Sequence, residues 1–514
     1  MNLGIESRMG NQLVYSRLNN LIRQIVTYIP GSLLPALLAL LSTVIFTRIF
    51  NVMEYGEYSL VLSTVTFIVA LAAQWISQSV NRYLPCAGNM EERAAITETI
   101  VFCQSIMVIT LLLGGALGFE LIPARWKIYY GAGLLLTIGM FLLNTLNSVF
   151  QAGMRAREYT VYALANSVLK LVVSLILVLG IQRHPVGMIQ GAALGTVVMV
   201  PTLWKKLGLT NPLLVLRAQA FRRQWAGFKQ FAGYGVPMIG WFLSAQLLML
   251  GDRYIIQMYR GTAEVGIYAA NYVLITGAIG LLCAPISLAA HPFLMKAWGD
   301  GSREQTAKWL GTITEWFLTV GMLLVCVTWI FSRDIALLFL GQNYRQGHFI
   351  MPIILAGLIS WQLGIYAHKP LEFAEKTRRM MGLIFLAAGM NLTLNYCLVP
   401  RYGYAAAACN SLISFTAYNV MAHISGRRIL SWKINCGAIL RSALISLAGA
   451  WLIIQIRGQV ETGFGYLTAF FAAVFSAFVL VGGVIYMNNY FSFLKRKEPD
   501  GLSVKSAGNK MPRQ

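Results

Sequence analysis

The sequence predicts an all-α polytopic membrane protein. Hydrophobic residues make up 57% of the 514 residues and charged residues only 12%, whereas soluble domains are about 45–50% apolar and about 25% charged. Apolar runs recur from one end of the chain to the other, and no polar linker separates them into soluble units. We therefore expect about 14 transmembrane helices, in two six-helix lobes related by pseudo-symmetry plus a C-terminal helix pair.

Each expected helix rests on an apolar run of sufficient length. A helix that rises 1.5 Å per residue needs about 20 apolar residues to cross a hydrocarbon core about 30 Å thick, and lipid cannot satisfy free backbone amides. The expected spans of the N-terminal lobe are 26–48, 58–80, 97–118, 130–152, 159–181 and 186–206. Those of the C-terminal lobe are 230–252, 267–290, 311–330, 349–367, 379–399 and 403–424, and the final pair is 437–456 and 464–487.

Residues 26–206 and 230–424 are thus the expected lobes, and 437–487 the added pair. Residues 1–25 are expected to be a cytoplasmic or interfacial N-terminus, because apolar residues of 12–25 recur near helical spacing between basic ones; a frayed terminus is the alternative. Residues 207–229 are read as a basic cytoplasmic linker, and 488–514 as a basic, polar cytoplasmic tail.

The net charge of +22 is distributed in short segments between the apolar runs. With the N-terminus inside, Lys and Arg on the predicted inner side outnumber those outside by roughly three to one, which predicts that both termini are cytoplasmic. A nucleic-acid partner is not expected, because no soluble module carries a basic face with stacking aromatic residues. Neither a metal nor a cofactor is expected, since the seven cysteines have no ligand spacing and no phosphate-binding loop occurs.

An internal repeat divides the chain. The segments TRIFNVMEYGEYSLVL (47–62) and DRYIIQMYRGTAEVGIYAANY (252–272) both carry Glu-x-Gly-x-Tyr, offset by 210 residues. The shared positions are Glu54, Gly56 and Tyr58 in the first segment and Glu264, Gly266 and Tyr268 in the second. Parallel repeats of this kind are related by an axis along the membrane normal and leave a cleft between the halves.

With these segments, the stretch MNLTLNYCLVPRYGYAAAACNSLISF from Met390 resembles the polysaccharide-transport (Wzx-type) flippases of the MOP superfamily. The resemblance covers nearly the whole chain, through loose motifs. It implies that undecaprenyl-diphosphate-linked oligosaccharide, such as O-antigen, capsule or exopolysaccharide units, is flipped across the bacterial inner membrane by alternating access. The implied partners are this lipid-linked oligosaccharide and membrane lipid, with an H⁺ or Na⁺ counter-ion and polymerase and chain-length proteins as candidates.

Lys170 is the clearest candidate for cargo binding. A charge within a span costs about 3 kcal/mol on insertion scales and usually faces the bundle interior or water. Lys170 lies about eleven residues into the fifth span, on a stripe with Asn166. We expect it to pair with the diphosphate or an acidic sugar; the alternative is a buried lysine bonded to backbone carbonyls.

Neutral amides form further helical stripes that could bind sugar hydroxyls. They are Asn144, Asn147 and Gln151 in the fourth span and Asn391, Asn395 and Asn410 in the eleventh and twelfth. Hydrogen bonds between helices are the alternative role. Arg48 and Arg253 occupy matching places in the repeat and could hold a diphosphate bidentately, or else extend to the outer interface.

Coupling to an ion needs a group whose charge or occupancy changes. Moving one charge through 100 mV is worth about 2.3 kcal/mol, so H⁺ or Na⁺ antiport is energetically feasible. The candidate carboxylates are Asp252, Glu57 and Glu315. Alternatively, the anionic cargo itself responds to the membrane potential.

Two other functions remain as alternatives. A MATE-like multidrug or cation antiporter would need an anionic lumen, whereas the mid-span charge here is Lys170. A membrane oligosaccharide polymerase or glycosyltransferase would be an enzyme with a long outer loop or a soluble domain, and the predicted outer loops are short. A non-enzymatic transporter is therefore the favoured prediction.

Overall fold

The computed structural model describes residues 30–432 except 32, 182, 216–217 and 300, together with scattered positions between 437 and 455. Across these residues the regular structure is entirely helical. Nine helices of this part of the chain are long and apolar enough to cross a membrane, and a shorter apolar helix, Leu33–Ile49, precedes them. The all-α polytopic fold is confirmed, whereas the count of 14 spans remains a prediction.

The expected segments 1–25 and 488–514, and nearly all of 437–487, lie outside the described residues. The N-terminal group consists of helix Leu33–Ile49, followed by five long helices with short 3₁₀ and π segments at Leu84–Cys86 and Leu177–Ile181. These are α2 (Val52–Tyr83), α3 (Met90–Phe119), α4 (Ala124–Ala152), α5 (Ala156–Ile176) and α6 (Val186–Leu207).

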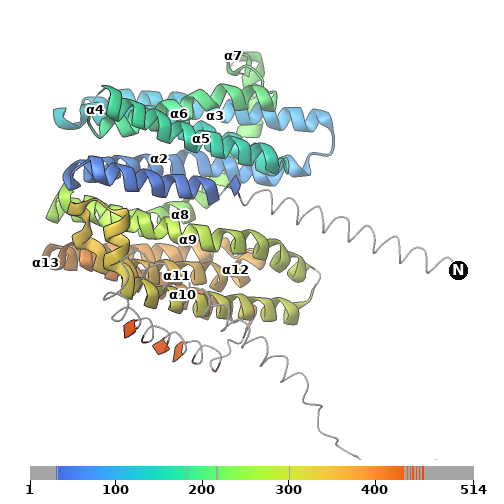
Figure 1. Ribbon diagram of the computed structural model, residues 1–514. Helices are drawn as coiled ribbons and strands as arrows, with labels where there is room; N and C mark the ends of the chain where they lie inside the picture. The colour runs from blue at the N-terminus through green and yellow to red at the C-terminus, as the bar shows by residue number, and fades with distance from the viewer. Residues whose placement is uncertain are drawn as a thin grey trace, which may run out of the picture.

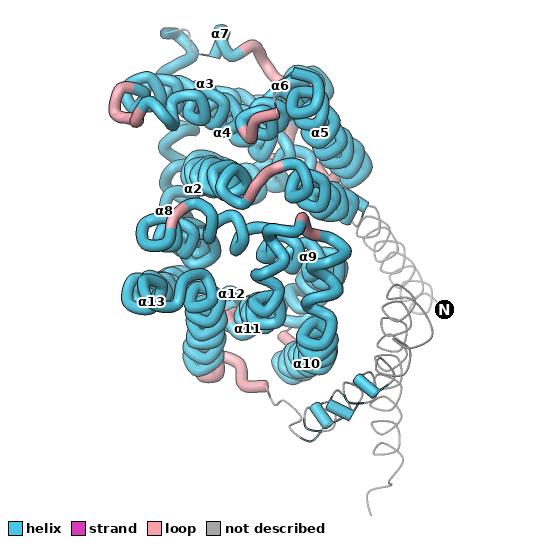
Figure 2. Tube along the Cα trace, turned by 60° about the vertical axis from the view of Figure 1, so that its left-hand side comes forward, coloured by secondary structure: helices cyan, strands magenta, loops and turns pink. Residues whose placement is uncertain are grey.

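The second group follows the short helix α7 (Pro212–Val215). It contains α8 (Ala218–Arg260), α9 (Thr262–Gly299), α10 (Arg303–Phe339), the 3₁₀ segment η3 (Gln342–Ile350), α11 (Met351–Ala367), α12 (Lys369–Phe373) and α13 (Thr377–Gly426). The helices run side by side along their length (Figure 1). Viewed closer to end-on, α3–α6 lie on one side and α10–α13 on the other, with α2, α8 and α9 between them (Figure 2).

Several helices extend beyond the apolar runs that predicted them. The segment between the expected spans 230–252 and 267–290 is almost entirely helical, because α8 continues to Arg260 and α9 begins at Thr262. Only Gly261 interrupts them, with φ at 85°, a conformation that glycine adopts at little cost. Hydropathy identifies the part of a helix inside the hydrocarbon and says little about its polar ends.

The expected spans 379–399 and 403–424 form the two arms of α13. The break lies at Gly403, whose φ of 61° and ψ of −148° interrupt the helix three residues after Pro400. The kink is held by Glu264, which accepts a hydrogen bond from the Tyr404 backbone N–H at 3.2 Å. The first residue of the second Glu-x-Gly-x-Tyr segment therefore caps the second arm of α13.

The two repeat segments pack directly against each other where α2 meets α9. A Cβ atom on Gly56 would lie 2.0 Å from the Thr262 carbonyl oxygen, and one on Gly266 would lie 1.8 Å from the Val52 carbonyl oxygen. Neither position leaves space for a side chain. Small residues at helix interfaces allow this backbone proximity in membrane proteins, so the repeat glycines set the distance between the two halves.

Replacing Gly266 with Ala should force α2 and α9 apart and lower stability by about 1–3 kcal/mol, as overpacking commonly does. We expect a lower thermal midpoint for the purified protein in detergent. Gly280→Ala is the matched control on the same helix, because a Cβ there meets no atom within 4 Å. Equal midpoints for the two variants would contradict the assigned contact.

Candidate functional site

A cavity of about 280 Å³ lies mainly within the N-terminal group. Its walls come from helix Leu33–Ile49 and from α2, α4, α5 and α6, while α8 contributes Arg253 and α9 contributes Val273. Lys170 and Arg253 both line it, and no acidic residue does so among the residues that the structure describes. The structure thus brings together two of the three cationic residues that the sequence singled out, one from each half of the chain.

Lys170 reaches the cavity because α5 and α6 pack unusually closely. A Cβ on Gly195 would lie 2.8 Å from the Lys170 backbone nitrogen, and one on Gly191 would lie 2.3 Å from the Ser174 Cα. Gly191 and Gly195 form the small-xxx-small pattern typical of close membrane helix pairs. Ser167, Lys170 and Ser174 then line the cavity from α5. Within the described residues, the Lys170 side chain has neither a carboxylate partner nor a hydrogen-bond acceptor.

Arg253 is only 6% exposed. Its Nη1 donates a hydrogen bond to Ser63 Oγ on α2 at 2.7 Å, and the guanidinium carbon lies 5.5 Å from the Tyr272 ring centroid. Its Nε is buried and has no acceptor. A buried N–H without an acceptor is costly, so Arg253 has donor capacity that an anion in the cavity can use.

The remaining polar lining is made of hydroxyl groups, of which the sequence pattern pointed only to Ser174, on the same helical stripe as Lys170. They belong to Ser42, Thr43, Tyr55, Tyr58 and Ser59 near the junction of helix Leu33–Ile49 with α2, and to Ser167 and Ser174 on α5. Tyr55 and Thr43 lie 3.4 Å apart by their oxygens. Hydroxyl residues do cluster around the first repeat segment, but within a span they indicate a polar cavity less strongly than ionisable residues do.

The other predicted residues of the N-terminal group lie outside the cavity lining. Asn166 is buried on α5, one turn before Lys170, and Asn147 is half-buried on α4. Both have a side-chain oxygen without a hydrogen-bond donor. Asn144 is half-buried and Gln151 is exposed, both on α4. Arg48 is exposed and donates to the Leu338 carbonyl at 2.7 Å, so it does not share the cavity with Arg253.

The three amides of the C-terminal half form a buried chain. Asn395 donates to Asn391 Oδ1 at 2.9 Å, and Asn410 donates to Asn395 Oδ1 at 3.0 Å. Asn391 in turn donates to Ser411 Oγ at 3.5 Å. All three amides are fully buried and join the two arms of α13. This arrangement matches the alternative role of such amides, hydrogen bonding between helices.

This series of hydrogen bonds continues through Ser411 to Asp252 on α8, which is 1% exposed. Its carboxylate accepts hydrogen bonds from the Arg253 backbone N–H at 2.8 Å, from Ser411 Oγ at 3.4 Å and from the Tyr268 hydroxyl. Tyr268 is the last residue of the second repeat motif. One ionisable group is therefore bonded to α8, α9 and α13 together.

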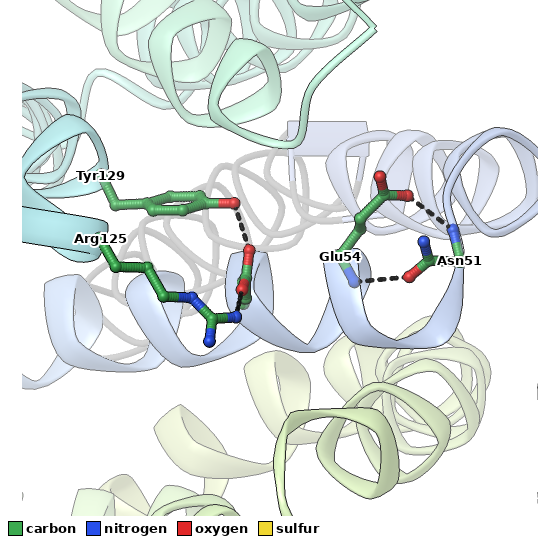
Figure 3. A network of polar contacts seen from close by, with 5 residues as sticks. Asn51, Glu54, Arg125 and Tyr129 are labelled. Carbon is green, nitrogen blue, oxygen red and sulfur yellow. Dashed lines mark hydrogen bonds and ion pairs between the residues drawn. The ribbon is translucent and has the colours of Figure 1, made fainter.

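The other two candidate acids have different surroundings. Glu57 is buried on α2 and is paired with Arg125 and with the Tyr129 hydroxyl at 2.6 Å, both on α4 (Figure 3). Near it, Asn51 and Glu54 cap the start of α2 by exchanging hydrogen bonds of 2.9 and 3.0 Å (Figure 3). Glu315 is half-buried on α10. Neither Glu57 nor Glu315 lines the cavity.

The two halves meet at both ends of the helices. At one end, the Tyr344 hydroxyl donates to the Phe50 and Asn51 carbonyls at 3.0 and 2.7 Å. At the other, Ser79 Oγ on α2 donates to the Phe231 carbonyl on α8 at 2.9 Å, and Tyr83 stacks on the Phe231 ring. Both sets of contacts must be broken in turn if each end is to open.

A family model described as polysaccharide biosynthesis protein matches residues 21–298, more than half of the chain. The chain belongs to the polysaccharide biosynthesis protein family. Among curated proteins, none matches it by sequence. The resemblance noted from the sequence motifs is confirmed at the level of this family.

Solved structures show which fold this family member has. It is similar to the lipid II flippase MurJ in an inward closed conformation, with a TM-score of 0.72, 14% identity and coverage of 92% of this chain and 100% of that one. An inward-facing MATE multidrug transporter of the MOP superfamily matches with a TM-score of 0.56 and 14% identity, covering 79% of this chain and 93% of that one. A MOP-superfamily transporter from Pyrococcus furiosus matches with a TM-score of 0.52 and 14% identity, covering 79% of this chain and 94% of that one. The fold is that of MOP-superfamily transporters, which agrees with the prediction of a non-enzyme.

Replacing Asn395 with Ala should destabilise the protein by about 1 kcal/mol, the magnitude typical of hydrogen bonds between membrane helices. The substitution leaves the Asn391 oxygen and the Asn410 amide group without their shared partner. Thr393→Ala is the control on the same arm of α13, because Thr393 is exposed and bonds only to the Gly389 carbonyl of its own helix. Detergent melting that ranks the two variants equally would show that the amide chain is not structural.

Proposed function

We propose that the protein flips undecaprenyl-diphosphate-linked oligosaccharide, such as O-antigen, capsule or exopolysaccharide units, across the bacterial inner membrane. The observation that carries the proposal is the shared cavity of Lys170 and Arg253, whose lining contains no acidic residue. In this proposal both termini are cytoplasmic, and the lobes 26–206 and 230–424 move relative to each other.

The chemistry of the cavity suits a diphosphate. The Arg253 guanidinium is a planar donor that can bind phosphate oxygens bidentately, and the Lys170 ammonium adds a compact point charge. The surrounding serine, threonine and tyrosine hydroxyls can donate to and accept from sugar hydroxyls. The apolar polyprenyl tail remains in the lipid, where it loses no hydrophobic burial.

The contacts between the halves support a proposal of alternating access. Tyr344 closes one end against Phe50 and Asn51, and Ser79 closes the other against Phe231. Further hydrogen bonds join the halves near these ends, such as Arg48 to the Leu338 carbonyl, and a typical bond contributes about 0.5–1.5 kcal/mol net. Cargo that binds one open state better than the other can shift an equilibrium of this size.

For ion coupling, Asp252 is the strongest of the three candidate acids. It lies next to Arg253 in sequence, and its hydrogen bonds to Tyr268 and Ser411 connect it to α9 and α13. A proton or Na⁺ arriving at this carboxylate would change its bonds to both helices. Glu57 is already paired with Arg125, which favours a structural role for it. A MATE-like cation antiporter is disfavoured by the cationic cavity.

Replacing Lys170 with Gln should lower glycan export at least about tenfold while Lys170→Arg retains more, because a charge-assisted hydrogen bond contributes about 1.5–3 kcal/mol. The measurement is the amount of lipid-linked oligosaccharide left on the cytoplasmic side in cells that depend on the variant. Lys308→Gln is the control, since Lys308 is exposed on α10. Wild-type export by Lys170→Gln at normal abundance would remove Lys170 from the proposal.

Replacing Asp252 with Asn should abolish the response of transport to a pH or Na⁺ gradient in proteoliposomes, while cargo binding persists. The amide keeps a hydrogen-bond acceptor for Tyr268 and Ser411 but cannot ionise. Glu57→Gln and Glu315→Gln test the other two candidates in the same assay. A full gradient response in the Asp252→Asn variant would exclude this carboxylate as the coupling site.

A further inference from the structure

A second hollow, an apolar groove of about 370 Å³, lies between α2, α3 and α4. It is distinct from the cavity that holds Lys170 and Arg253. Its lining includes Val61 and Thr64 of α2, Thr110 and Gly114 of α3, and Tyr129 and Thr137 of α4.

The hydroxyl groups in this groove are already satisfied by the protein. Each lining threonine donates to a backbone carbonyl of its own helix, Tyr130 donates to the Gly115 carbonyl at 2.9 Å, and Tyr129 donates to Glu57. A polar ligand would therefore find few free partners. The groove presents the aliphatic and aromatic surfaces of its side chains, which suit a hydrocarbon occupant.

The groove also belongs to the membrane-facing side of the N-terminal group. On α3, the neighbouring Leu112, Leu113 and Leu117 are between 50% and 78% exposed, as expected for side chains in contact with lipid. Helices α2 and α4 separate the groove from the cavity. Leu62 and Leu136 line the cavity, whereas their neighbours Val61 and Thr137 line the groove. A cargo tail anchored in the cavity is thus separated from the groove by two helices.

Charges of both signs lie at the end of the groove formed by the α3–α4 turn. The Arg125 side chain is 62% exposed, and a single nitrogen pairs it with Glu57; Figure 3 shows it beside Tyr129, a lining residue. Lys127 and Glu120 lie 3.8 Å apart, and the Glu120 side chain is 82% exposed. This end therefore offers cationic donors and an accessible carboxylate close together.

We propose that the groove is a binding site for a membrane phospholipid with a zwitterionic primary-amine headgroup, of the phosphatidylethanolamine type. One acyl chain fills the space between α2, α3 and α4. The phosphate lies at Arg125 and Lys127, and the ammonium group donates to Glu120. A primary ammonium has three N–H donors, whereas a quaternary choline ammonium has none, so the headgroup selects between these two lipids.

The bound lipid supports the wall of the cavity. The hydroxyl of Thr64, a lining residue, forms a 2.8 Å hydrogen bond with the Tyr254 hydroxyl on α8. Tyr254 is the residue after Arg253. Lipid packed against α2 therefore stabilises the region from which Arg253 reaches the cavity. A ligand that binds only the folded protein raises its stability by mass action, and loss of this lipid should lower the thermal midpoint.

The test uses the purified full chain and no glycan, so its outcome is independent of the proposed function. Native mass spectrometry would count the phospholipids retained from nanodiscs that contain phosphatidylethanolamine, phosphatidylcholine or phosphatidylglycerol. Gly114→Leu places a side chain in the groove, and its Cβ would meet no described atom within 4 Å. Gly131→Leu is the matched control, an exposed glycine on α4 with the same free space and no place in the groove lining.

We expect the wild type and Gly131→Leu to retain one phosphatidylethanolamine, and Gly114→Leu to lose it. Glu120→Gln, a surface change that leaves the fold intact, should reduce the preference for phosphatidylethanolamine over phosphatidylcholine at least threefold. Equal retention by Gly114→Leu and Gly131→Leu would overturn the groove as the site. Equal retention of all three lipids, or a preference for phosphatidylglycerol, would overturn the headgroup assignment.

Discussion

The close backbone approach of α2 and α9 at Gly56 and Gly266 determines how the two halves of the protein meet. Because α9 follows α8 after the single residue Gly261, docking of α9 on α2 also places the end of α8 beside α2. Arg253 then reaches Ser63 on α2 and becomes part of a cavity formed mostly by the N-terminal group. The place of Arg253 in the cavity thus depends on the repeat contact.

A buried guanidinium is costly in a membrane protein. Here part of the cost is offset by the hydrogen bond to Ser63 and by the Tyr272 ring, which attracts the cation electrostatically. The nearby Asp252 carboxylate is bonded to Tyr268, Ser411 and a backbone N–H. Arg253 thus keeps a buried donor without an acceptor among the described residues, beside an acid that already accepts three hydrogen bonds.

The sequence predicted much of the fold, because twenty-residue apolar runs have few alternatives to helices in lipid. It also pointed to Lys170, since a charge in the middle of a span rarely faces acyl chains; Lys170 does line the cavity, while its role in binding cargo stays a prediction. The sequence did not predict that Arg253 lines the cavity and Arg48 does not. The two occupy matching positions in the repeat, but only the second half's helix continues past this point, to Arg260, so the repeat is equivalent in sequence and not in surroundings.

The amides show another limit of prediction. Asn391 and Asn395 lie at helical spacing in the eleventh expected span, and Asn410 lies on a separate polar stripe in the twelfth, as residues facing a polar path would. The same spacing also suits hydrogen bonds between neighbouring helices, and the sharp bend at Gly403 folds the two arms of α13 together so that the amides pair with one another. Sequence periodicity identifies a helix face but not what lies opposite, and that depends on the packing of helices distant in sequence.

The central claim is that Lys170 and Arg253, from different halves, act on one anion. Its most direct test is a double-mutant cycle on the affinity of the purified protein for undecaprenyl diphosphate, with Lys170→Gln, Arg253→Gln and the double variant. Residues that share a ligand are coupled, so we predict that the double variant loses clearly less affinity than the sum of the single losses. Strict additivity of the two losses, or no loss in either single variant, would contradict the shared site.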